Sequence, residues 1–187
     1  MTKQELIRKN AAKVIAQEGY HNTTVQMIAD EAGVAVGTIY NYFGNKKEIL
    51  NYIFKVEFKK RTKLLDRLNK EEISLKEKLR IFLDNHFTAL QANPNEATVL
   101  VQESRLPSKY SLESVDNFIN NLPQLLAKIL NEAIDKGEIK AINPQLIANA
   151  IFHAIRGVAI QAVENQDDYD FEMAKEELFN FIWSGLI

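Results

Sequence analysis

Residues 23–50 read TTVQMIADEAGVAVGTIYNYFGNKKEIL, and this stretch decides the fold of the N-terminal part of the chain. Thr24 is a residue type that caps helix starts, and Gly33 can adopt the left-handed conformation that turns the chain after a helix. A second, short helix is predicted over residues 36–43, where Gly44 stops it. Two short helices joined by a turn that contains glycine form a helix-turn-helix, whose second helix can enter the major groove of DNA.

The second short helix combines apolar residues for packing with polar residues for an outer surface. Val34 and Ile39 are apolar and are expected to hold the helix against the interior. The hydrogen-bonding groups expected on the outer surface belong to Thr38, Tyr40, Asn41 and Tyr42. Lys46 follows at the start of the next helix, where an ammonium group, free N–H groups and the helix dipole can together bind a phosphate.

Charge is distributed unevenly along the chain. The 187 residues carry a net charge of −2, yet residues 1–63 hold 11 Lys and Arg against 6 Asp and Glu. The remaining residues hold 12 basic against 19 acidic side chains. A basic head on an acidic body favours contact between the head and an anion such as nucleic acid, although unevenly solvated charge gives the same totals.

Few chain breakers and helical spacing of the apolar residues predict an all-α fold of about nine helices. The chain has only 7 Gly and 4 Pro, and it shows no long alternating strand pattern. The residue pairs that predict helix starts are Thr2 with Glu5, Asn45 with Glu48, Ser74 with Glu77, and Asn143 with Pro144. The helices are expected between Thr2 and Gly19, between Thr24 and Gly33, and over residues 36–43, 46–68, 74–93, 95–105, 111–136 with a bend at Pro123, 144–164 and 170–184.

The run AGVAVGTIYNYFGNKKEIL, residues 32–50, resembles the DNA-binding signature of the tetracycline-repressor (TetR) family. Its glycines, aromatic residues and Lys46 all fall in register with that signature. The resemblance implies a transcriptional repressor, not an enzyme, with a helix-turn-helix domain over residues 1–46 and a helical ligand-binding and dimerisation domain over residues 47–187. The chain departs from the family at Ala35, where Ser or Thr often caps the helix, and at Val36, where a polar residue is common.

The same resemblance implies a role for individual residues on double-stranded operator DNA. Phosphate contacts are implied for Thr24, Tyr42 and Lys46. Contacts with base edges are implied for Gln26, Val36, Gly37, Thr38 and Asn41, and Tyr40 could make either kind of contact. Gln26 and Asn41 are the best adenine readers, because an amide can pair with both N6 and N7 of the base.

A second likeness is spread over residues 78–187. The segments KLRIFLDNHFTAL, Glu103-Ser104-Arg105, LNEAIDKGEIK and NQDDYDFEMAKEELFNFIWSGLI are similar to the acyl-CoA-responsive FadR-type repressors within the TetR family. This likeness implies a long-chain acyl-CoA as a small-molecule effector that releases the repressor from DNA, and no cofactor. A multidrug-type repressor with an aromatic pocket is the alternative.

An acyl chain needs an apolar tunnel, and CoA adds phosphates that basic side chains can bind. The residues predicted to bind this ligand are Phe82, His86, Phe87, Glu103, Arg105, Phe118, Leu122, Phe152 and Arg156. Arg105, Lys109 and Arg156 are the candidates for the CoA phosphates. Periodicity cannot tell a tunnel from a packed core, so the aromatic members fit either.

The last two predicted helices are expected to form a homodimer. The helix over residues 144–164 has two apolar faces, one more than the core of a monomer requires. The final helix carries Phe171, Leu178, Phe179, Ile182 and Trp183. A dimer would place two recognition helices about 34–36 Å apart, or a multiple of that distance, to reach successive major grooves.

Two other classes of protein stay open at this point, a helical-bundle enzyme and a helical adaptor that binds only protein. The chain shows no nucleophile with a base and an orienting group. It has no cysteine, and His21, His86 and His153 show no metal-ligand spacing. No signal peptide is expected, and residues 147–163 hold too many polar groups to span a bilayer, so a cytoplasmic protein without a membrane partner is predicted.

Overall fold

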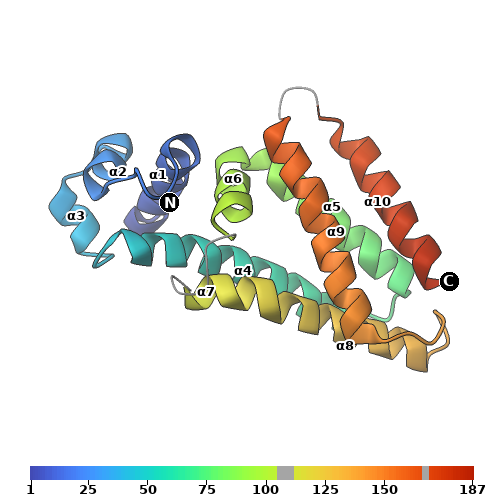
Figure 1. The fold of residues 1–187 in the computed structure, drawn as a ribbon. Helices are drawn as coiled ribbons and strands as arrows, with labels where there is room; N and C mark the ends of the chain where they lie inside the picture. Colours follow the sequence, from blue (N-terminus) through green and yellow to red (C-terminus); the bar gives the residue numbers. More distant parts are fainter. Residues whose placement is uncertain (105–111, 166–168) are drawn as a thin grey trace. The chain divides into compact units, whose positions relative to one another are not determined.

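A computed structural model describes residues 1–104, 112–165 and 169–187, and in these residues every secondary-structure element is helical (Figure 1). The elements run from α1 to α10, with one π-helical turn between α7 and α8. Because α7, this turn and α8 follow one another without a break, they form one irregular helix. The described part of the chain therefore contains nine helices, which confirms the predicted all-α fold.

The helices belong to two compact units. The first comprises Met1–Phe58 and Asn93–Phe118. Its helices are α1 (Lys3–Glu18), α2 (Val25–Ala32), α3 (Val36–Tyr40), the first part of α4 (Lys46–Lys70), α6 (Pro94–Glu103) and α7 (Glu113–Asp116). The second unit comprises Lys59–Ala92 and Ile119–Ile187. Its helices are the rest of α4, α5 (Leu75–Ala92), α8 (Leu122–Asp135), α9 (Pro144–Glu164) and α10 (Phe171–Leu186).

This division differs from the predicted domains, which meet between residues 46 and 47. Helix α4 begins at that point and is continuous, and the boundary between the two units falls within it, after Phe58. In addition, α6 joins the first unit because it packs against α1. The two units are defined by contacts between residues, whereas the predicted domains follow the sequence family. The domain boundary after residue 46 therefore stays a prediction.

Local capping explains where several helices begin. The Thr24 hydroxyl accepts the Met27 N–H at 3.1 Å, and the Asn143 side chain accepts the Leu146 N–H at 3.0 Å. Ser74 and Glu77 exchange two such bonds, at 3.3 and 3.1 Å. These bonds satisfy N–H groups that the first turn of a helix leaves free, and they confirm the predicted starts.

The helix predicted to bend at Pro123 is irregular close to that residue. The π-helical turn covers Asn117–Asn121, and α8 begins at Leu122. Pro123 has no N–H and cannot donate the usual bond to the preceding turn. The π-helical turn ends two residues before the one where that bond is missing.

In the first unit, a buried ion pair joins α1 to α6. Arg8 and Glu96 are both buried, and their side chains lie 2.9 Å apart. Arg8 also lies 2.6 Å from Glu5 on its own helix. Burial alone would lower the pKa of Arg8, but the hydrogen bonds to Glu96 and Glu5 outweigh it and raise that pKa.

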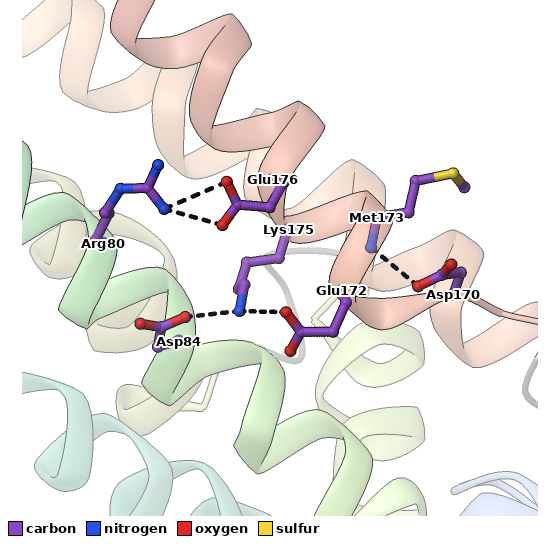
Figure 2. A network of polar contacts seen from close by, with 7 residues as sticks. All are labelled: Arg80, Asp84, Asp170, Glu172, Met173, Lys175 and Glu176. Atoms are coloured by element: carbon purple, nitrogen blue, oxygen red, sulfur yellow. Dashed lines mark hydrogen bonds and ion pairs between the residues drawn. The ribbon is translucent and has the colours of Figure 1, made fainter.

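In the second unit, ion pairs hold α10 beside α5 (Figure 2). One guanidinium nitrogen of Arg80 lies 2.9 and 3.3 Å from the two carboxylate oxygens of Glu176. The ammonium group of Lys175 lies 2.7 Å from Glu172 and 2.9 Å from Asp84. These two bonds raise the pKa of Lys175 to about 12. The pairs from Arg80 and Asp84 connect α5 to α10, whereas that between Lys175 and Glu172 lies within α10.

The inward face of α10 contains several of the apolar residues of this final helix. Leu178, Phe179 and Ile182 are buried within the unit and are therefore not free to contact a second subunit, and the homodimer through the last two helices stays a prediction. Helix periodicity showed an apolar face but not which element covers it. The large apolar side chains that α10 leaves exposed are Met173 and Phe181.

Helix α9 is strongly apolar and only partly buried within its own chain. An 18-residue window of this helix has a mean hydropathy of 1.5, and only 28% of the window is buried. Among the described residues it is the one helix long and apolar enough to cross a membrane. The prediction that it is too polar to do so was too strict, because its aliphatic residues outweigh Asn149, His153, Arg156 and Gln161 in the average.

Replacing Arg8 with Met should lower the free energy of unfolding by about 3 kcal/mol, because Glu96 would be left charged and buried without its partner. The double variant Arg8→Met/Glu96→Leu should recover most of this loss. Urea unfolding measures both, with Lys9→Met as the control at an exposed position on the same helix. Equal losses for the single and double variants would contradict a paired charge at this position.

Candidate nucleic-acid interface

The turn between α2 and α3 has the geometry expected from the sequence. Gly33 has a φ of +62°, in the left-handed region that favours glycine. Its N–H and that of Val34 donate to the carbonyl oxygens of Asp30 and Ala29, at 3.2 and 3.0 Å. These bonds fold α3 back across α2, so that Ile39 becomes fully buried.

Beyond Ile39, the end of α3 and the following turn point outward. Tyr40 and Tyr42 are 54% and 44% exposed, and Asn41 between them is exposed as well. The helix ends at Tyr40, earlier than predicted, and residues 41–43 continue as a turn in which Tyr42 and Phe43 donate to the Ile39 carbonyl. Phe43 is buried, and its ring packs against that of Tyr52.

The other residues predicted to contact bases differ in exposure. Gly37 and Gln26 are exposed, whereas Val36 and Thr38 are half-buried. The Gln26 amide donates to the Asp30 carboxylate at 2.7 Å, so it would have to exchange this partner to bind a base. The spacing of four residues on one helix face could have revealed that pair.

Lys46 has partners inside the chain that the sequence does not reveal. Its ammonium group donates to the backbone carbonyl oxygens of Tyr20, His21 and Thr23, at 2.5, 3.1 and 2.6 Å. It also lies 4.5 Å from the centre of the Tyr20 ring. Burial lowers the pKa of Lys46, and the nearby Glu103 opposes this shift. Since every residue has a carbonyl, no sequence pattern marks these three acceptors, and the phosphate contact of Lys46 stays a prediction.

Glu103, predicted to bind the ligand, accepts a hydrogen bond from the Tyr20 N–H, and its contact with a ligand stays a prediction. It lies at the end of α6, is 7% exposed, and accepts the Tyr20 N–H at 3.3 Å. Burial raises its pKa, against the opposing effects of the Tyr20 N–H, His21 and Lys46. Phe118 also has a partner in the first unit, because its ring packs edge-to-face on that of Phe54 with 5.8 Å between ring centres.

The remaining predicted ligand residues that the structure describes belong to the second unit. On α5, the rings of Phe82 and His86 are stacked 6.5 Å apart, and His86 meets Phe87 edge-on at 5.6 Å. Leu122 is buried at the start of α8, and α9 carries the half-buried Phe152 and Arg156. Arg105 and Lys109 lie outside the described residues, so the ligand site as a whole stays a prediction.

Two surface pockets of the second unit are lined by other residues. One, of about 590 Å³, is lined by Asn69, Gln124, Ala127, Lys128, Asn131, Glu132, Pro144 and Gln145. The other, of about 520 Å³, lies between α9 and α10 and is lined by Val158, Gln161, Tyr169, Asp170, Met173, Ala174, Glu177, Leu178 and Phe181. Neither includes a predicted ligand residue. The described residues also hold no group of three or more acidic or histidine side chains that could bind a metal ion.

Both parts of the chain match known protein families. Residues 7–53 match the family described as bacterial regulatory proteins, tetR family, and residues 57–185 match the C-terminal region of YsiA-like proteins. A fatty acid metabolism regulator protein of Bacillus subtilis strain 168 is 33% identical over 177 residues, which cover 94% of this chain and 91% of that protein.

Solved structures of related regulators share the fold. The transcriptional regulator FadR from Bacillus subtilis, in complex with stearoyl-CoA, superposes with a TM-score of 0.87 and 32% identity, over 98% of this chain and 99% of that one. The fatty acid degradation regulator FadR from Bacillus halodurans gives a TM-score of 0.86 at 28% identity, over 97% and 95% of the two chains.

The raised pKa of Glu103 predicts a pH dependence of stability. A group that binds its proton more tightly in the folded state stabilises the fold below its unfolded pKa, here 4.5, and this contribution disappears as the pH rises through the folded pKa. The unfolding free energy of the wild type relative to Glu103→Gln should therefore fall as the pH rises from 4 towards neutrality. Urea unfolding at several pH values measures this difference, and a difference that stays constant with pH would show that burial does not raise the pKa of Glu103.

Proposed function

Because the chain belongs to the TetR family of bacterial regulatory proteins, we propose that it is a cytoplasmic repressor that binds operator DNA as a homodimer and leaves it when a long-chain acyl-CoA binds. The observation that carries the DNA-binding part is the exposure of Tyr40, Asn41 and Tyr42 beside the buried Ile39. Two exposed tyrosines, one at the end of a short, anchored helix and one in the turn that follows, offer apolar surface and hydrogen-bonding groups to a groove.

Residues of the head divide by chemistry between phosphate and base contacts. Thr24 and Tyr42 present hydroxyl groups to phosphates, and Asn41 presents an amide to a base edge. The further base-edge residues are Gln26, Val36, Gly37 and Thr38, and Tyr40 can serve either role. Val36 can contact only apolar groups such as a thymine methyl, so specificity at its position rests on packing.

A long-chain acyl-CoA is proposed as the effector on two grounds. A regulator 32% identical over nearly the whole chain has been solved in complex with stearoyl-CoA. In this chain, aromatic and aliphatic side chains of α5, α8 and α9 gather within the second unit, among them Phe87 and Leu122. These residues supply the apolar lining that an acyl chain needs, and Arg156 supplies a cation for the CoA phosphates.

Helix α4 is proposed to transmit the effect of the ligand. It contributes Lys46 to the head and continues to Lys70 among the helices of the second unit, where Asn69 bonds Glu132 of α8 at 3.0 Å. Ligand binding would shift this helix and change the spacing between the two heads of the dimer. The ligand favours release only by the difference between its affinities for the two arrangements.

The proposed dimer uses α9 and α10. On α9, Leu146 is exposed and several apolar side chains are only half-buried within the chain, and α10 adds the exposed side chains of Met173 and Phe181. A second copy would bury this surface, which explains its hydropathy without a membrane.

The operator hypothesis is tested with a duplex from the region upstream of the gene that encodes the protein. Mobility shift should show binding that weakens steeply as salt rises, because phosphate contacts release counterions. Stearoyl-CoA at micromolar concentration should release the DNA, whereas coenzyme A alone should not. Binding that does not weaken as salt rises would exclude a DNA-binding head. DNA binding that is unchanged by stearoyl-CoA would exclude this effector class.

Replacing Phe181 with Glu should break the dimer. Burying an unpaired carboxylate in an apolar interface costs several kcal/mol, so the dissociation constant of the dimer should rise by about 100-fold or more. Light scattering after gel filtration reports the mass, with Gln124→Glu as the control that adds the same charge to an exposed position on α8. If the Phe181→Glu variant remains dimeric at low concentration, the α9–α10 surface is not the interface.

A further inference from the structure

The carbonyl contacts of Lys46 join the two ends of the helix-turn-helix. Thr23, whose carbonyl accepts from Lys46 at 2.6 Å, directly precedes the residue that caps α2. Lys46 itself is the first residue of α4, directly after the turn that follows α3. The segment from Thr24 to Asn45 contains both short helices, and this bond closes it at its base.

The ammonium group has no donor left for another partner in this arrangement. An ammonium group carries three N–H bonds, and three carbonyl oxygens accept from it. A phosphate contact would require Lys46 to exchange at least one of these carbonyls, of which that of His21 is the exposed and most distant one, at 3.1 Å. A residue with this geometry can support DNA binding without touching DNA.

A carboxylate on a distant segment fastens the same loop from the other side. The carbonyl of Tyr20 accepts from Lys46, and the N–H of Tyr20 donates to Glu103. Tyr20 thus links a cation at the start of α4 to a buried anion at the end of α6. The N–H and the carbonyl of Tyr20 belong to the two peptide groups on either side of its Cα, so the two bonds together hold the backbone at this residue, and the charged partner strengthens each bond.

We propose that Lys46, Tyr20 and Glu103 form a clasp that holds the helix-turn-helix in its DNA-binding orientation, with Lys46 and Glu103 as positioning residues. This inference rests on the proposed DNA-binding function. It assigns Lys46 a part in affinity that does not depend on a phosphate contact. It also gives Glu103, an acidic residue, a favourable effect on the binding of a polyanion.

The sign of the Glu103 effect separates positioning from simple electrostatics. Removing a negative charge near a DNA-binding head strengthens binding, or leaves it unchanged, if charge alone matters. Removing a positioning residue weakens it. The variants are Glu103→Ala, Glu103→Gln, which keeps an oxygen acceptor for the Tyr20 N–H, and Lys46→Met, with the exposed neighbour Lys47→Met as the matched control.

The full-length variants are compared on the same upstream duplex across a salt titration. Lys46→Met and Glu103→Ala should each weaken binding by about tenfold or more, with the slope against salt concentration unchanged, and Glu103→Gln should lie closer to the wild type. A Lys46→Met slope reduced by about one phosphate contact would overturn the inference in favour of a direct contact. Glu103→Ala binding as tightly as the wild type, or more tightly, would overturn it as well.

Amide hydrogen exchange provides a readout that needs no DNA. Exchange over residues 19–24 should accelerate by about tenfold or more in Lys46→Met and Glu103→Ala, and stay unchanged in Lys47→Met. Unchanged exchange in both clasp variants would refute the clasp even if the wild type binds DNA. Accelerated exchange in a protein that does not bind DNA would support the clasp and refute the proposed function instead.

Discussion

The placement of α3 is the constraint on which the rest of the head depends, because a helix of five residues does not persist in water by itself. Its position comes from its neighbours. Ile39 is fully buried, the left-handed turn at Gly33 sets the direction of entry, and the bonds of Lys46 to the loop before α2 close the motif. Together they turn Tyr40, Asn41 and Tyr42 outward, so that the buried Ile39 is followed directly by an exposed polar surface at the end of the helix and in the next turn.

The second unit is organised by a different constraint, because its helices carry apolar surface that few neighbouring helices can cover. Helix α10 turns Phe179 and Leu178 inward and is held beside α5 by exposed ion pairs, each of which contributes at most about 1 kcal/mol. Burial of the apolar side chains therefore decides which face of α10 points inward, and the ion pairs add a smaller contribution. After α8 and α10 have packed against α9, several apolar side chains of α9 are still only half-buried, and the proposed dimer would cover them.

Features determined by a few neighbouring residues could be predicted from the sequence, and features determined by distant contacts could not. The caps at Thr24 and Ser74 and the conformation of Gly33 follow from local chemistry, and the structure has them where they were expected. The acceptors of Lys46 are backbone groups about 25 positions away, which carry no sequence signal. The hydrogen bond from the Tyr20 N–H to Glu103 likewise depends on the packing of α6 against α1, a contact between segments far apart in the sequence. Resemblance to the family identified the DNA-binding segment, but only the packing separated inward from outward residues on α10.

That α3 reads DNA within a two-fold dimer is tested most directly by the sequences that the purified protein selects from a pool of random duplexes. Two identical heads related by a two-fold axis should enrich an inverted repeat whose half-site centres lie about 10 base pairs, or a multiple of that spacing, apart. A selected site with a single unrepeated element, or no enrichment at low salt, would contradict a dimer that recognises DNA through this helix.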